Sequence, residues 1–217
     1  MDIYWLGQAA FKLKGKKATL IIDPYKEDMV GLKLPKDLSC DVALSTHNHD
    51  DHNNTGVLTS LSGKPLVFSD PGEYEVAGII ITGIRSFHDS EAGASRGKNL
   101  IFHMMFDGLN IVHLGDLGQS KLTEEQVAEI GAVDILLIPV GSVYTIDGKA
   151  AAGIVSQLEP KIIIPMHYKL EGLKFELEGP EGFLKEMGAE GVSVVPKLSI
   201  TKEKLPEEPM VVLLSKT

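Results

Sequence analysis

Three histidines and two aspartates lie close together in one short segment of the sequence, residues 46–52. The segment reads H-x-H-x-D-H, with His47, His49, Asp51 and His52 at the four defined positions. Neutral imidazoles and carboxylates are the ligands that suit zinc and similar divalent ions. In an extended stretch, His47 and His49 would point the same way, whereas Asp51 and His52 lie around the following turn. The segment therefore predicts metal binding, and its spacing could serve two neighbouring ions.

Three further side chains, His88, Asp116 and His167, are candidates to complete such a site, because each follows a predicted strand. A loop that leaves a strand end can aim its side chains into one cleft while the sheet holds its base. Gly115 would let the backbone approach a crowded metal centre, and an imidazole at the end of a buried run is costly without a partner. His113 competes with His88 as a ligand, although its position inside a predicted strand favours a packing or supporting role.

The elements that must position these residues are mostly short strands in the first half of the chain, with helices clearer in the second half. Asp107-Gly108 indicates a hairpin, and the capping-box pattern from Thr123 to Gln126 opens a helix that Gly131 ends. Strands are predicted over residues 3–6, 11–14, 18–22, 42–45, 66–68, 79–84, 100–106, 110–114, 134–139, 161–165, 192–195 and 210–214, and helices near 56–61, 123–130, 150–158 and 180–187.

Two segments of the chain resemble one another weakly. Asp41 and Asp134 each stand directly before a buried strand. This hints at duplicated halves, but no longer periodicity supports the hint.

Length and composition predict one folded domain over residues 1–217. The chain is long enough for one sizeable core, and its 43% hydrophobic and 24% charged residues are ordinary for a globular protein. A formal net charge of −9 makes nucleic-acid binding unfavourable, and no apolar run is long enough to cross a membrane. The single cysteine, Cys40, excludes an internal disulfide framework. We expect a cytoplasmic protein without a signal peptide, and the sequence leaves its oligomeric state open.

An ordered series of motifs resembles the metallo-β-lactamase superfamily, and in particular its branch of small proteins similar to ascorbate-6-phosphate lactonase. The resemblance spans nearly the whole chain. It departs from the family's pattern at Gln8, where a histidine is frequent after Trp-Leu-Gly. The motifs are Trp5-Leu6-Gly7, Leu20-Ile21-Ile22-Asp23-Pro24, His47 to His52, Pro71-Gly72-Glu73-Tyr74, Phe87-His88, His113-Leu114-Gly115-Asp116, Ile138-Pro139-Val140-Gly141 and Pro165-Met166-His167-Tyr168.

The resemblance implies an α+β fold, a four-layer αββα sandwich, with a dinuclear metal site at one edge. In this arrangement three histidines would bind the first metal ion, and Asp116 would bridge the two ions. Asp23 would support the site by orienting a ligand. The implied ligands are His47, His49 and His88 for the first ion, and Asp51, His52 and His167 for the second.

These residues predict a metal-dependent hydrolase that acts on a small molecule. A water held between two divalent ions loses a proton near neutral pH, and the resulting hydroxide could attack a lactone, ester, amide or phosphoester. Asp51 and Asp116 are the expected catalytic carboxylates, and Asp51 could also relay the proton. Zinc is the expected metal, while manganese and iron accept the same ligands. The alternatives are a di-iron redox enzyme on the same fold and a non-catalytic metal-binding protein.

Overall fold

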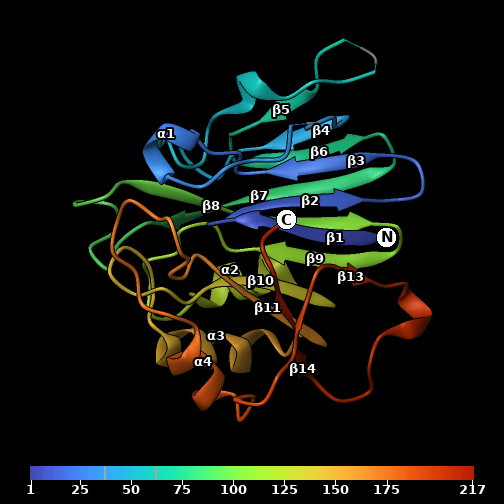
Figure 1. Cartoon of the computed structure of the whole chain (residues 1–217). Coiled ribbons are helices and arrows are strands. Elements are labelled where there is room, and N and C mark those ends of the chain that lie inside the picture. Colours follow the sequence, from blue (N-terminus) through green and yellow to red (C-terminus); the bar gives the residue numbers. More distant parts are fainter. Residues whose placement is uncertain (37, 62) are drawn as a thin grey trace.

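The computed structural model describes residues 1–36, 38–61 and 63–217, and over these ranges the chain forms a six-stranded sheet, a seven-stranded sheet and a two-stranded pair (Figure 1). The six-stranded sheet has the strand order β13-β1-β2-β3-β4-β5, and the seven-stranded sheet has the order β14-β11-β10-β9-β8-β7-β6. The third sheet pairs β12 with β15.

Most of the strands are short, and several consecutive strands are joined by tight turns. Those of the six-stranded sheet and the small pair are β1 (Asp2–Gly7), β2 (Ala10–Lys14), β3 (Thr19–Ile22), β4 (Val42–Leu44), β5 (Leu66–Phe68), β13 (Leu198–Ser199), β12 (Val194–Val195) and β15 (Leu213–Leu214). Those of the seven-stranded sheet are β6 (Gly72–Val76), β7 (Ile79–Phe87), β8 (Lys98–Phe106), β9 (Leu109–His113), β10 (Ile135–Pro139), β11 (Ile162–Met166) and β14 (Met210–Val211). The helical elements are α1 (Glu27–Val30), α2 (Glu124–Ile130), α3 (Gly148–Leu158), α4 (Glu181–Glu186) and the 3₁₀ turns η1 (Thr55–Val57) and η2 (Lys202–Lys204).

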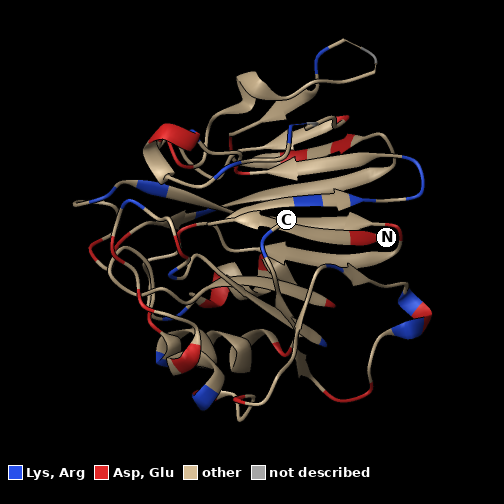
Figure 2. Cartoon of the chain, viewed as in Figure 1, with Lys and Arg blue, Asp and Glu red and all other residues tan. Residues whose placement is uncertain are grey.

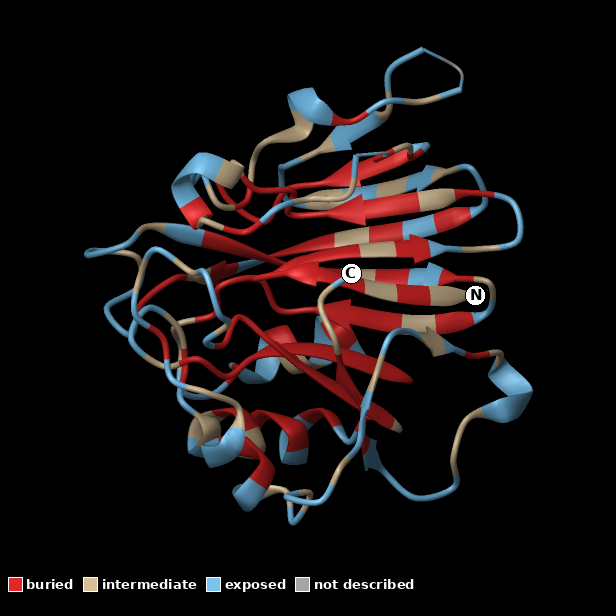
Figure 3. Cartoon of the chain, in the orientation of Figure 1, coloured by how far each residue is buried: buried red, intermediate tan, exposed pale blue. Residues whose placement is uncertain are grey.

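The two large sheets share one hydrophobic core. Alternate residues of their strands meet in it, as period-two side-chain alternation requires: Trp5 and Phe11 from the six-stranded sheet, and Ile81 and Phe102 from the seven-stranded sheet, are each at most 1% exposed. Figure 3 shows this buried material along the central strands, with exposed residues mainly in loops and at edges. The core fixes the sheets against each other and so fixes the strand ends that carry the candidate ligands.

Helices cover the outer face of the seven-stranded sheet, and α3 packs on both β10 and α4 (Figure 1). The outer face of the six-stranded sheet has a second apolar cluster, in which Ile21 and Ala43 meet Tyr25 and Val30. This face is covered by the one-turn helix α1 and by irregular segments. The predicted α+β sandwich is confirmed, with a much thinner helical layer on this side.

The predicted hairpin turn at Asp107-Gly108 and the predicted capping box at Thr123 are both confirmed. Asp107 and Gly108 both have positive φ, 53° and 78°, which is the conformation of a type I′ hairpin turn between β8 and β9. Thr123 and Gln126 form the reciprocal capping box of α2, and Gly131 follows its last turn.

Several local elements differ from the prediction. The helix expected over 56–61 is only the 3₁₀ turn η1, because the following residue is extended and Thr59 pairs with Ser39 in a parallel bridge. Strand β6 was not predicted, since its sequence Gly-Glu-Tyr-Glu-Val is largely polar. The strand expected over 210–214 divides, because β14 pairs with β11 whereas β15 pairs with β12.

The weak similarity between the segments at Asp41 and Asp134 corresponds to the same local hydrogen bonding in both places. Asp41 bonds Thr19 twice: its backbone N–H donates to the Thr19 carbonyl, and its carboxylate accepts the Thr19 N–H at 2.8 Å. Asp134 makes the same two hydrogen bonds with Asn110, the carboxylate bond again at 2.8 Å. In both places an aspartate before a parallel strand holds the start of its neighbour.

Charged groups of both signs are interspersed along loops and element ends, as Figure 2 shows. Over the described residues, no helix is long and apolar enough to cross a membrane.

Candidate metal centre

The sequence-predicted ligands come from the ends of four strands. Four of them lie in the loop after β4, while His88 follows β7, Asp116 follows β9 and His167 follows β11. Strands β7, β9 and β11 run in the same direction, because β7 and β9 are both antiparallel to β8 and β11 is parallel to β10 beside β9. Their carboxyl ends therefore meet at one edge of the sheet, next to the β4 loop of the other sheet.

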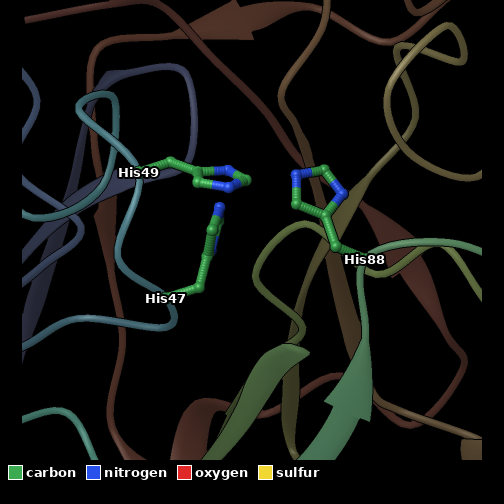
Figure 4. A group of neighbouring side chains, drawn as sticks. All are labelled: His47, His49 and His88. Atoms are coloured by element: carbon green, nitrogen blue, oxygen red, sulfur yellow. The ribbon is translucent and has the colours of Figure 1, made fainter. Parts of the chain in front are cut away.

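His47, His49 and His88 form the first group of candidate ligands. One nitrogen of each ring lies within 4.8 Å of those of the other two, and Figure 4 shows the three rings turned toward a common point. His47 and His88 are buried, whereas His49 is exposed. The group therefore has a closed inner side and an open outer side.

Asp51, His52, Asp116 and His167 form the second group, with ligand atoms likewise within 4.8 Å of one another. Asp116 stands between the groups. Its Oδ2 lies 3.1 Å from His52 Nε2, 3.2 Å from His167 Nε2 and 3.3 Å from His88 Nε2. One carboxylate thus contacts histidines of both groups.

Several buried polar atoms of the two groups have no hydrogen-bond partner within the protein. Among the described residues these atoms include His47 Nε2, His88 Nδ1 and Asp116 Oδ1. Buried polar groups are normally paired, and unpaired ones cost free energy. The donor set, neutral imidazole with carboxylate, is the set that divalent transition metals accept. The residues therefore fit a pair of metal ions.

The protonation states of His47, His49 and Asp116 favour binding of a cation. Burial lowers the pKa of His47 to about 2, and the charge of His52 adds to the effect, so the imidazole of His47 is neutral. Burial also lowers the pKa of His49. Burial opposes ionisation of Asp116, but the charges of His167 and His52 outweigh it and hold the carboxyl pKa well below its usual value.

The pKa of His52 shifts upward, in the opposite direction to those of His47 and His49. Burial lowers its pKa, but the carboxylates of Asp116 and Asp51 outweigh burial and hold the pKa well above its usual value. His52 therefore carries a proton when no ion is bound. A metal ion that binds His52 must displace this proton.

Asp23 fixes the loop that carries the first ligands. It is fully buried, its Oδ1 accepts the Thr46 N–H at 2.7 Å, and its Oδ2 accepts the Thr46 hydroxyl at 2.8 Å. The same Oδ2 lies 2.9 Å from His52 Nδ1. A proton held on Nδ1 by this contact leaves Nε2 free for a cation. Sequence reasoning gave Asp23 a supporting role but assigned none to Thr46.

Asp116 is positioned by Asn99, a residue that sequence reasoning missed. Asn99 is 1% exposed, and its Oδ1 accepts the Asp116 N–H at 3.0 Å while its Nδ2 donates to the Leu114 carbonyl. The available signal was a polar residue at the start of a long apolar strand. Gly115 has φ +57°, and a side chain there would collide with Asn99 and Thr46, so the predicted need for a small residue is confirmed.

His113, the rival of His88, lies outside both groups. Its Nε2 is 2.8 Å from the Ala9 carbonyl and its Nδ1 accepts the Gly115 N–H at 3.1 Å, so both ring nitrogens already have partners. The structure places His88, and not His113, beside the other candidate ligands.

The loop after His88 is tied down by one carboxylate. The two oxygens of Asp89 accept four backbone N–H groups, at distances of 2.7–3.0 Å. At the far end of the loop, the Arg96 guanidinium donates to the carbonyls of Val143 and Tyr144 and lies over the Tyr144 ring. The loop between β7 and β8 is therefore anchored at both ends.

These bonds make the fold of the loop dependent on pH. The N–H of Arg96 and the other backbone donors lower the pKa of Asp89 to about 2, whereas an unfolded aspartate titrates near about 4. The stabilisation is therefore fully present above about pH 4 and is lost as pH falls through about 2. In an NMR titration, the amide proton of Arg96 should shift with a midpoint near pH 2. A midpoint near pH 4, or a titration that persists in Asp89→Asn, would contradict this.

The candidate ligands open onto a cavity of about 530 Å³. His49, Asp51, His88, Asp116 and His167 line it, and Met29, Arg96, Tyr144 and Phe175 form another part of its wall. Arg85 and Lys98 line a neighbouring cavity. Tyr168 is buried and packs on Trp5, with ring centroids 4.8 Å apart, so it lies away from the mouth.

Comparison with known proteins identifies the family. A model described as the β-lactamase superfamily domain matches residues 2–167. A candidate Zn-dependent hydrolase of the metallo-β-lactamase superfamily from Thermotoga maritima superposes with a TM-score of 0.80 and 36% identity, over 98% of this chain and 97% of that protein. A UPF0173 metal-dependent hydrolase from Methanosarcina mazei is 30% identical over 87% of this chain and 91% of its own length. Another from Pyrococcus abyssi is 31% identical over 77% and 84%. The chain belongs to the metallo-β-lactamase superfamily and is a metal-dependent hydrolase.

Proposed function

We propose that the protein holds two divalent metal ions, zinc being the first choice, and uses them to hydrolyse a lactone, ester, amide or phosphoester. In this proposal His47, His49 and His88 hold one ion, and Asp51, His52 and His167 hold the other. Asp116 bridges them. The observation that carries the proposal is the contact of the Asp116 carboxylate with histidines of both groups.

The ions would supply Lewis acidity and lower the pKa of a coordinated water. The protein supplies the rest. Asp116 and Asp51 bring negative charge that balances the two cations, and the pKa of Asp51 is held at about 2, with burial raising it and the charge of His52 lowering it more strongly. Asp51 is ionised at neutral pH and lines the cavity. So low a pKa makes Asp51 a weak base, and a proton relay through it would be secondary to its role as a ligand.

The part of the cavity wall formed by Met29, Arg96, Tyr144 and Phe175 favours an uncharged substrate with an apolar substituent. Met29 is 43% exposed and Tyr144 36% exposed, and the Tyr144 ring packs edge-on against Phe175 at 5.9 Å between centroids. Among the described residues that line this cavity, Arg96 is the only lysine or arginine, and its guanidinium already donates to two carbonyls. Esters and lactones with an apolar group therefore fit this wall better than phosphoesters do.

The proposal is tested by metal analysis together with a substrate panel. The protein loaded with zinc, manganese or iron is expected to bind two ions per chain and to hydrolyse members of a panel of lactones, esters, amides and phosphoesters, with aryl and alkyl esters or lactones turned over fastest. Binding of two ions without turnover of any panel member would count against a hydrolase, and iron with redox turnover in its place would overturn the proposal. Single-ion stoichiometry would contradict the bridging role of Asp116.

A further inference from the structure

A fully buried amide lies against the second group of candidate ligands. Gln8 is 0% exposed, and its Nε2 is 3.2 Å from His167 Nε2. Its Oε1 has no hydrogen-bond partner among the residues that the structure describes. The amide therefore makes one contact, and that contact is with the nitrogen through which His167 also approaches Asp116.

We propose that Gln8 is an additional ligand of the second metal ion, through its side-chain oxygen Oε1. The inference rests on the proposed function, since it assumes that Asp51, His52, Asp116 and His167 hold an ion. Nothing in the chain's motifs assigns such a role to Gln8.

The first argument is competition for one nitrogen. His167 Nε2 can accept a hydrogen bond from the Gln8 amide or bind a metal ion, but its single lone pair cannot do both. When His167 binds the ion, the Gln8 amide loses its one partner, and a buried amide without partners is costly. The amide oxygen, unlike the NH2 group, can bind a cation, so rotation of the amide would give its Oε1 a partner in the ion.

The second argument is spacing. Two donor atoms on one tetrahedral zinc ion lie about 3.3 Å apart, because each is about 2.0–2.1 Å from the metal. In the second group, Asp116 Oδ2 is 3.1 Å and 3.2 Å from the two histidine nitrogens, and the Gln8 amide nitrogen is 3.2 Å from His167 Nε2. The oxygen and nitrogen of an amide are assigned from hydrogen bonds and interchange by a half turn. A half turn puts Oε1 at this ligand-like distance.

The third argument is that the backbone holds Gln8 in place. The Gln8 carbonyl accepts hydrogen bonds from Trp5 Nε1 at 2.8 Å and from the His167 N–H at 3.1 Å. Gln8 and His167 also both have positive φ, 53° and 52°. Left-handed backbone at non-glycine residues is unfavourable and persists where the surroundings enforce it, often at functional sites. Gln8 and His167 are thus joined by a main-chain hydrogen bond and by a side-chain contact.

Ligation by Gln8 would make the two metal sites unequal. The first ion would have three histidine nitrogens and an Asp116 oxygen, whereas the second would have two histidine nitrogens and oxygens from Asp51, Asp116 and Gln8. Oxygen ligands suit manganese, while imidazole suits zinc. We therefore expect the second site to tolerate manganese better than the first.

The test compares metal binding by the wild type with Gln8→Met, which keeps the length of the side chain but has no amide oxygen, and with Gln8→Glu, which keeps an oxygen donor. Calorimetric titration of the metal-free protein with Mn²⁺ and Zn²⁺ should show that Gln8→Met raises the Kd of the second ion about 10-fold or more and leaves that of the first unchanged. Gln8→Glu should retain both ions. With Co²⁺, the visible absorption of the second ion should become stronger in Gln8→Met, because Co²⁺ absorbs more strongly when it has fewer ligands.

The control is Gln126→Leu, which removes another buried glutamine but lies in the capping box of α2. It should lower stability and leave both metal affinities unchanged. Unchanged second-ion affinity and Co²⁺ absorption in Gln8→Met would overturn the proposal, as would equal losses at both sites. If Gln8→Met does not fold, loss of the second ion in Gln8→Glu would overturn it. A wild type that binds only one ion would instead contradict the proposed function.

Discussion

Replacement of Asp116 by alanine is expected to lower kcat/KM by more than about 100-fold, because loss of a group that merely supports a ligand already costs about 10- to 100-fold. The Asp116 carboxylate contacts His52, His88 and His167, so its loss would remove an oxygen from both of the proposed ion sites. It also leaves the protonated His52 without its strongest negative partner. Metal content by elemental analysis and turnover on the best panel substrate measure both effects.

Asp147→Ala is a matched control for this prediction. Asp147 is an exposed N-cap whose carboxylate accepts the Ala150 N–H at 2.8 Å. Its loss should destabilise α3 by about 1 kcal/mol and leave the metal content of the loaded protein unchanged. If Asp116→Ala keeps two ions and wild-type turnover, Asp116 is not the bridging ligand.

Replacement of Asp23 by asparagine is expected to weaken binding of the second ion about 10- to 100-fold. Asparagine tolerates the left-handed backbone of this position, where φ is 48°, so the substitution changes chemistry more than conformation. An amide N–H facing His52 Nδ1 would donate to that nitrogen, and the ring proton would then sit on Nε2. A protonated Nε2 has no lone pair for a metal ion.

Titration with Zn²⁺ and measurement of turnover check this prediction. The variant Thr46→Val separates the contribution of the Thr46–Asp23 hydrogen bond from that of the Asp23–His52 contact. Thr46→Val removes the hydroxyl that donates to Asp23 Oδ2 but leaves the contact between Asp23 and His52. It should therefore cost stability, about 1 kcal/mol, with a smaller loss of metal affinity. Equal metal affinity in Asp23→Asn and the wild type would show that Asp23 does not set the protonation of His52.

The order and spacing of the motifs predicted a metal-dependent hydrolase of the metallo-β-lactamase superfamily, and the comparison with known proteins confirms this prediction. The narrower similarity to ascorbate-6-phosphate lactonases, the single domain, the ligand roles and the cytoplasmic location remain predictions. Local elements were predictable where the signal lies in adjacent residues, as at the Asp107-Gly108 hairpin and the Thr123 capping box. Strand β6 was missed because its sequence is largely polar. The division of 210–214 was not predictable because pairing with the distant strands β11 and β12 decides it.

The sequence by itself determined which residues could bind metal, because residue type sets the ligand chemistry and the H-x-H-x-D-H spacing is local. It left His88 and His113 as rivals, and it could not assign a role to Gln8 or Asn99. Only the tertiary structure decided these points, by giving both nitrogens of His113 backbone partners and by bringing Gln8 beside His167, 159 positions away. The physical reason is that hydrogen bonding, burial and charge depend on neighbours in space, and the packing of two sheets on one core determines those neighbours.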